Sequence, residues 1–135
     1  MKLSLVTPEK KTFEGDIDQV TIPTSQGNIT VLPNHMSVVA QLEPGELIVK
    51  QGNKETNIAS GYGFAQITGK QVSVLTDLAE EVSEISEKEA EEARKRAVEA
   101  LKDKERLSSE EYASVAAALE KSLVRLRIKR RHRSY

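Results

Sequence analysis

Glycine and proline, the residues that most often interrupt regular backbone, are confined to the first half of this chain. The four prolines and seven glycines all lie between Pro8 and Gly69, and neither type occurs after Gly69. Charge changes along the chain as well: residues 1–85 carry 6 basic and 11 acidic side chains, whereas residues 86–135 carry 14 and 10. Since such residues mark turns and their absence permits long helices, the sequence predicts two domains, 1–84 and 85–135.

The turn-rich half has the pattern of an antiparallel β-sandwich. Short runs of alternating or β-branched residues are separated, about every 8 to 12 positions, by clusters of residues that tolerate turn dihedrals. Two such sheets, each with one apolar face, would supply a core for roughly 80 residues. The predicted strands are 3–7, 19–22, 29–32, 37–41, 47–50, 56–59, 64–67 and 71–75.

The second half predicts two helices joined as an antiparallel hairpin. Ser86 stands three residues before Glu89, and Ser108 three residues before Glu111, which is the spacing of an N-terminal capping box. Two amphipathic helices joined by about five residues fold back on each other, and alanines permit their close approach. The predicted apolar stripes are Ala90, Ala93, Ala97, Ala100 and Leu101 in the first helix, and Tyr112, Val115, Ala116, Leu119, Leu123 and Leu126 in the second.

The composition excludes several classes of protein. The absence of cysteine excludes disulfides, thiolate zinc sites and thiol nucleophiles, and favours a reducing compartment. His35 and His132 lie far apart, with no carboxylate cluster at metal-ligand spacing, so we expect no metal site. No apolar run approaches the 18 or so residues of a membrane span, and no signal peptide opens the chain.

No arrangement of residues indicates an active site, and we therefore predict that the chain is not an enzyme. Neither a Ser-His-Asp set nor a phosphate-binding glycine loop is present. Gly61-Tyr62-Gly63 lies between two predicted strands, where no helix N-terminus could receive an anion, so it is interpreted as a turn. His35 in a loop is more typical of a turn-stabilising residue than of a catalyst.

The C-terminus is strongly basic. The last 15 residues hold seven basic side chains and no acidic one. Such a run favours an anionic partner, either a carboxylate-rich protein surface, nucleic acid or anionic lipid. Nucleic-acid binding usually adds aromatic side chains that stack on bases, and only Tyr135 lies near these charges. Protein carboxylates are favoured, and a small nucleic-acid-binding module remains the alternative.

The order of the two domains, together with four motifs, resembles the epsilon subunit of bacterial F-type ATP synthases over essentially the whole chain. The most specific motif is Gly27-Asn28-Ile29-Thr30-Val31-Leu32-Pro33-Asn34-His35, which is similar to the family pattern Gly-x-x-x-(Ile/Val)-Leu-Pro-(Gly/Asn)-His. The others are Leu42-Glu43-Pro44-Gly45, Ala59-Ser60-Gly61-Tyr62-Gly63-Phe64 and Val72-Ser73-Val74-Leu75.

The resemblance implies a non-catalytic rotor subunit of the central stalk, at the cytoplasmic face of the cell membrane as a peripheral part of the complex. Its sandwich would bind the gamma subunit and the c-subunit ring, coupling proton-driven rotation to ATP synthesis. Its helical hairpin would either fold back or extend into the catalytic head, where it would inhibit ATP hydrolysis.

The resemblance also implies contact residues. The loop Gln26-Gly27-Asn28 and His35 would face the c-ring, with Asn28 a neutral residue where the family is often acidic. The basic tail would meet an acidic segment of the catalytic beta subunit. The tail residues predicted for that contact are Arg125, Arg127, Arg130, Arg131 and Arg133.

Some bacterial members of that family bind ATP through a motif (Ile/Leu)-Asp-x-x-Arg-Ala at the start of the first helix. Here Ile85 and Ala90 match the ends of the motif, but Ser86 replaces its Asp and Glu89 replaces its Arg. A negative charge thus stands where phosphates favour a positive one. The sequence predicts weak ATP binding or none, with Arg94 and Arg96 as partial substitutes, so a free-standing ATP-binding regulator is disfavoured.

Overall fold

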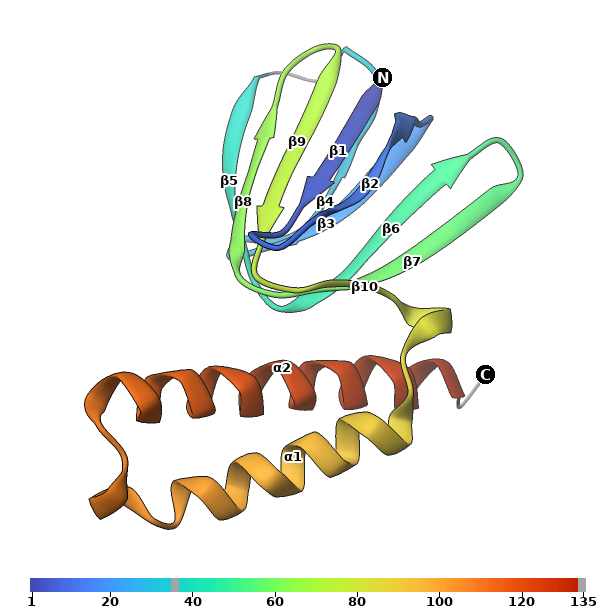
Figure 1. Ribbon diagram of the computed structural model, residues 1–135. Helices are drawn as coiled ribbons and strands as arrows, with labels where there is room; N and C mark the ends of the chain where they lie inside the picture. Colours follow the sequence, from blue (N-terminus) through green and yellow to red (C-terminus); the bar gives the residue numbers. More distant parts are fainter. Residues whose placement is uncertain (35–36, 134–135) are drawn as a thin grey trace. The chain divides into compact units, whose positions relative to one another are not determined.

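The computed structural model describes residues 1–34 and 37–133 and divides into two compact units, Met1–Ser83 and Glu84–Tyr135. The first unit is built of β-strands and the second of helices (Figure 1). The predicted fold class, a β-sandwich followed by two packed helices, is confirmed.

The strands of the first unit form one sheet that folds over into two layers (Figure 1). One layer has the order β5-β8-β9-β1-β2, and the other has β10-β7-β6-β3 with β4 on β3. The described strands are β1 (Lys2–Val6), β2 (Lys11–Asp16), β3 (Gln19–Thr24), β4 (Gly27–Val31), β5 (Val38–Leu42), β6 (Gly45–Gln51), β7 (Lys54–Ser60), β8 (Gly63–Ile67), β9 (Gln71–Thr76) and β10 (Ala79–Glu81).

The two layers are continuous through a single register pair in the described strands, Thr24 of β3 with Leu42 of β5. Among the described strands, four of the nine pairings are hairpins of consecutive strands, as the turn spacing predicts: β1 with β2, β3 with β4, β6 with β7 and β8 with β9. β1 and β9 instead run parallel, with Leu3 opposite Val72 and Leu5 opposite Val74. They are far apart in the sequence, so no hairpin constrains their direction, and this parallel pair was not predicted.

The core lies between the layers and is made by alternate residues of each strand. Leu3 and Leu5 of β1 are fully buried, whereas Lys2, the residue before Leu3, is exposed. Each strand thus points one apolar face inward. The other members of the core are Ile17, Val20, Ile22, Val31, Leu42, Leu47, Val49, Ile58, Ala65, Ile67, Val72, Val74 and Ala79.

Two strands were not predicted from the sequence, β2 and β10. Phe13 is the one large apolar residue of β2, and it is half-buried. The residues next to it in the sequence are charged or polar, so β2 lacks the alternation of apolar residues that predicts a strand. β10 is three residues long and pairs with β7 through Ala79 opposite Ser60. Its existence depends on the partner strand, which local sequence does not reveal.

Gly61 and Tyr62 connect β7 to β8 at the position of the predicted turn, and Gly63 is the first residue of β8. A Cβ added at Gly63 would lie 1.9 Å from the carbonyl oxygen of Leu75, so only glycine fits this close approach of two backbones. The buried hydroxyl of Thr76 organises the turn: it donates to Tyr62 O or Leu78 O, each 3.1 Å away, and accepts from Gly61 N at 3.2 Å. Gly63 thus permits the close packing of these two backbones.

The second unit contains α1 (Glu87–Leu101) and α2 (Ser109–Arg133), with a short 3-10 helix, Lys104–Arg106, in the connection between them. Another 3-10 helix, Val82–Glu84, spans the boundary between the two units. Ser86 Oγ accepts a hydrogen bond from Glu89 N at 3.2 Å. At α2, Ser108 Oγ accepts from Glu111 N at 3.1 Å, and Glu111 Oε1 accepts from Ser108 N at 3.5 Å. The two predicted capping positions are confirmed, and α1 and α2 lie side by side (Figure 1).

The apolar stripe predicted for α2 is only partly right. Leu126 is buried, but Tyr112 is 39% exposed and Leu123 is 47% exposed. α2 buries Val124 and Ile128 instead, which lie roughly half a turn around the helix from Leu126. The prediction assumed one buried face, and the arginines that alternate with these apolar residues concealed the second.

Candidate functional site

The turn between β3 and β4 carries the residues expected to face the c-ring. Gln26, Gly27 and Asn28 are all exposed, and Gly27 adopts φ +103°, a left-handed conformation that favours glycine. Thr24 fixes the turn, because its hydroxyl donates to Gly27 O and accepts from Gln26 N at 3.2 Å. The turn therefore presents two amide side chains on a rigid backbone.

His35, the other residue of that predicted contact, lies outside the described residues. Asn34, just before it, follows β4 at the strand end opposite to Asn28, and Asn34 N donates to Gly69 O at 2.9 Å. The five residues of β4 thus separate the Gln26-Gly27-Asn28 turn from Asn34. The structure does not bring Asn34 and the turn together on one end of the sandwich.

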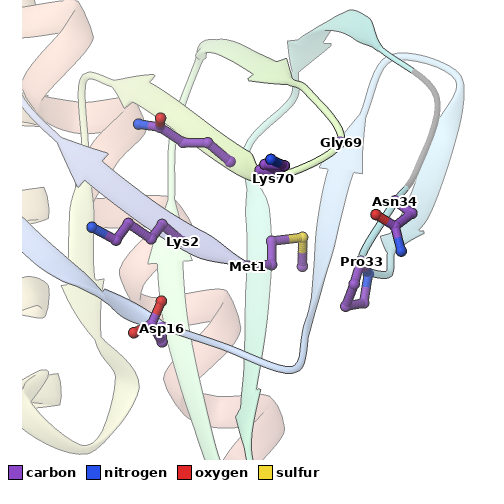
Figure 2. Close-up of a pocket in the computed structure, with 8 residues that line it drawn as sticks. Met1, Lys2, Asp16, Pro33, Asn34, Gly69 and Lys70 are labelled. Carbon is purple, nitrogen blue, oxygen red and sulfur yellow. The ribbon is translucent and has the colours of Figure 1, made fainter.

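A hollow of about 420 Å³ lies at the Asn34 end of the sandwich. Figure 2 shows Lys2, Lys70 and Asp16 around it, with Met1 near its centre. The charges are mixed, two lysines with one carboxylate, and none of these side chains is buried. The geometry specifies no ligand. The remaining lining residues are Pro33, Asn34, Gly69 and Gln71.

An exposed apolar surface on the outer side of β5, β8 and β9 was not predicted. Val39 is 68% exposed, Phe64 59% and Leu75 55%. Phe64 lies directly opposite Leu75, and Val39 is diagonal to Phe64 because it pairs with Gln66. We call these three residues the apolar face.

Alternation along the strands predicts that the apolar-face residues point outward, once it is known which strands are neighbours. In β8, Ala65 and Ile67 point into the core, so Phe64 and Gln66 must point outward. A large apolar residue in the outward phase is ordinary in one strand. Its recurrence in three adjacent strands distinguishes this surface, and strand order is not visible from the sequence.

Four charged residues form a cluster between α1 and α2. Arg130 Nε lies 2.9 Å from Glu87 Oε1, and Arg130 Nη2 lies 3.3 Å from Glu91 Oε2. Arg94 Nε donates to the other Glu91 oxygen at 3.1 Å. The hydrogen bond from Arg94 lowers the pKa of the Glu91 carboxyl, aided by the charges of Arg94, Arg130 and Lys95 and opposed by partial desolvation. Glu91 is therefore ionised at neutral pH.

The altered ATP motif lies at the start of α1. Ile85 and Ala90 are buried, Ser86 caps the helix, and Glu89 is exposed. Arg94, expected to substitute for the missing arginine, is hydrogen-bonded to Glu91. Arg96 is exposed on α1. A phosphate would thus have to compete with a neighbouring carboxylate for Arg94.

The basic tail is the C-terminal part of α2. Arg127, Arg130 and Arg131 are exposed and Arg125 is half-buried, while the side chain of Arg133 lies outside the described part. Arg130 forms ion pairs with Glu87 and Glu91 of α1.

Neither a membrane span nor a metal site is found where the structure is described. No helix over residues 1–34 and 37–133 is both long and apolar enough to cross a bilayer. Over the same residues, no three side chains of His, Cys, Asp or Glu are grouped so that they could hold a metal ion.

Residues 1–82 match the family model described as "ATP synthase, Delta/Epsilon chain, beta-sandwich domain". Two similar proteins are ATP synthase epsilon chains, each 35% identical to this chain. That of Herpetosiphon aurantiacus aligns over 99% of this chain and 97% of its own length, and that of Geobacter metallireducens over 95% and 92%.

Solved structures give a similar result. A chain in the Euglena gracilis mitochondrial ATP synthase (OSCP/F1/c-ring) matches with TM-score 0.64 and 26% identity, over 87% of this chain and 74% of that one. A chain in the central stalk and c-ring of the Tetrahymena thermophila mitochondrial ATP synthase shares the fold, with TM-score 0.53 at 16% identity.

We predict that millimolar ATP barely raises the melting temperature of this protein. A site with a dissociation constant 100 times below the ATP concentration would add about 2.7 kcal/mol, a rise of several degrees. The matched variant is Ser86→Asp with Glu89→Arg, which rebuilds the motif and keeps a good N-cap. Differential scanning fluorimetry should show a larger rise for this variant, and a rise of several degrees in the unaltered chain would refute the prediction.

Proposed function

Because the chain belongs to the epsilon-chain family of ATP synthases, we propose that it couples rotation of the c-ring to ATP synthesis and restrains ATP hydrolysis. It is a non-catalytic subunit of the central stalk. In this proposal the unit Met1–Ser83 assembles the rotor and the unit Glu84–Tyr135 regulates it.

The observation that carries the assembly role is the apolar face. Soluble domains seldom leave large apolar side chains clustered on neighbouring strands without a partner. Val39, Phe64 and Leu75 come from the three strands β5, β8 and β9, so the sheet holds them rigidly. We assign this surface to the gamma subunit, the rotor partner of the family's sandwich domain.

The Gln26-Gly27-Asn28 turn is the proposed contact with the c-ring. Its exposed amide groups suit the polar loops expected of that ring, and Asn28 would donate or accept a hydrogen bond there without a charge. Binding to the ring would hold the protein at the cytoplasmic face of the membrane as a peripheral part of the complex.

The basic end of α2 supports the inhibitory role. Seven basic side chains without an acidic one create a positive field at the C-terminal end of the helix. The proposed partner is an acidic segment of the catalytic beta subunit. The nucleic-acid alternative is disfavoured by the sequence of α2, where no Phe, Tyr or Trp accompanies the basic residues between positions 113 and 133.

We predict that Phe64→Asp weakens binding to the gamma subunit about 30-fold or more. A carboxylate would be desolvated in an apolar interface, and central interface residues often contribute 2 kcal/mol or more. The matched control is Leu32→Asp, since Leu32 is also exposed but lies outside β5, β8 and β9. Titration calorimetry measures both, with circular dichroism to confirm folding. Equal affinities for the two variants would count against the apolar face as the gamma site.

We also predict that changing Arg125, Arg127, Arg130, Arg131 and Arg133 together to Gln relieves inhibition of ATP hydrolysis and leaves assembly intact. Each exposed ion pair contributes only about 0.2 to 1 kcal/mol, so single changes should be mild. High salt should act in the same direction. The assay is ATP hydrolysis by the reconstituted complex at low and high salt.

The control for this prediction removes the same number of basic side chains elsewhere in the helical unit. It should leave inhibition unchanged. Equal inhibition by the tail variant and the unaltered protein at low salt would show that apolar packing, and not charge, holds the inhibitory state. The control positions, all changed to Gln, are Lys88, Lys95, Arg96, Lys102 and Arg106.

A further inference from the structure

The ion pairs of Arg130 join the two helix ends that lie farthest from the connecting loop. Glu87 is the first residue of α1, and Arg130 lies in the last turn of α2. The connection between the helices is at the opposite end, over residues 102–108. The 15 residues of α1 span about 22 Å, so the loop alone exerts little hold on these free ends.

α1 buries only small apolar side chains, although α2 buries Val124, Leu126 and Ile128 near its C-terminal end. The buried residues of α1 are Ala90 and Ala97, whose methyl groups bury little area. Leu123 of α2, expected in the interface, is nearly half exposed. Because the buried side chains of α1 are alanines, the ion pairs add a directional contact that holds Glu87 and Glu91 to α2.

The geometry of the charge cluster favours its closed form. Arg94 hydrogen-bonds one oxygen of Glu91 and leaves the other for Arg130, so the Glu91 carboxylate is already oriented before α2 approaches. Orientation in advance reduces the side-chain entropy lost when a surface ion pair forms. Arg130 also reaches Glu87 through a different nitrogen and thus holds two carboxylates at once.

We propose that Glu87, Glu91, Arg94 and Arg130 form an ionic latch that keeps the helical hairpin closed, so that breaking it frees the C-terminal turns of α2. The latch requires no bound nucleotide, because Arg94 and Arg130 pair with carboxylates of the same chain. The proposal rests on the proposed function only for its consequence in the complex, which is that the latch sets how readily the tail reaches the beta subunit.

The test measures hairpin opening in the isolated full chain. The chain has no native cysteine, so Lys88→Cys and Arg131→Cys, both at exposed positions, permit two specific spin labels. Pulsed electron-electron double resonance then gives the distribution of distances between the two spin labels, one on α1 and one on α2. In this background we compare Arg130→Gln with Arg106→Gln, which removes the same charge from a local pair with Asp103 at the loop end.

We expect Arg130→Gln to raise the population at long distance by roughly 1.4- to fivefold per pair lost, the range of exposed ion pairs. Arg106→Gln should leave it unchanged. About 1 M salt should open the unaltered chain and have little further effect on Arg130→Gln. Adding Glu87→Gln and Glu91→Gln to Arg130→Gln should open the hairpin no further, because the partners act as a unit.

The latch is contradicted if Arg130→Gln leaves the distances unchanged, if Arg106→Gln has the same effect, or if the added Glu→Gln changes open the hairpin further by an independent amount. Circular dichroism of each variant shows whether α1 and α2 stay helical. The latch can also be broken from the α1 side by Glu87→Gln with Glu91→Gln, which leaves every tail arginine in place. If that double variant opens the hairpin but hydrolysis by the complex does not respond, the latch stands and the proposed inhibitory function fails.

Discussion

Burial of alternate residues between the two layers of the sheet is the constraint on which the β unit depends. Leu3, Leu5, Val72 and Val74 point inward from the parallel pair β1 and β9, and the antiparallel strands obey the same alternation. Because every second residue is committed to the core, the residues between them are available for other contacts. The apolar face exists for this reason: Phe64 points outward because Ala65 and Ile67 point inward.

The helical unit depends on different interactions. Its helix starts are defined by Ser86 and Ser108, and the buried side chains of its first helix are the alanines Ala90 and Ala97. A rigid sheet and a weakly packed hairpin suit the two proposed roles. Assembly needs a surface of constant shape, whereas regulation needs two conformations of similar free energy, and a few exposed ion pairs are enough to shift such a balance.

The sequence predicts features set by local pattern and not those set by neighbours distant in the chain. The capping serines, the turn at Gly61-Tyr62-Gly63 and the order of the two parts were predictable because each rests on residues adjacent in sequence. β10, the parallel pairing of β1 with β9 and the apolar face were not, since each depends on which strand lies beside which.

The candidate site shows the same limit. The basic tail was evident from the sequence, but the pairing of Arg130 with Glu87 and Glu91 required the two helices to be brought together, across more than 38 residues of chain. Gln26-Gly27-Asn28 and His35 were grouped from the resemblance to the family; the structure describes the turn and Asn34, with β4 between them, and His35 lies outside the described residues.

The most direct test of the central claim is site-specific cross-linking in the assembled ATP synthase. Gln66 lies among the apolar-face residues and Lys54 is exposed on β7 of the other layer. Each is changed to Cys in turn in this cysteine-free chain and joined to a short photoactivated cross-linker. The account predicts a product with the gamma subunit from Gln66→Cys and not from Lys54→Cys. A complex that incorporates both variants but gives no gamma product from Gln66→Cys would contradict it.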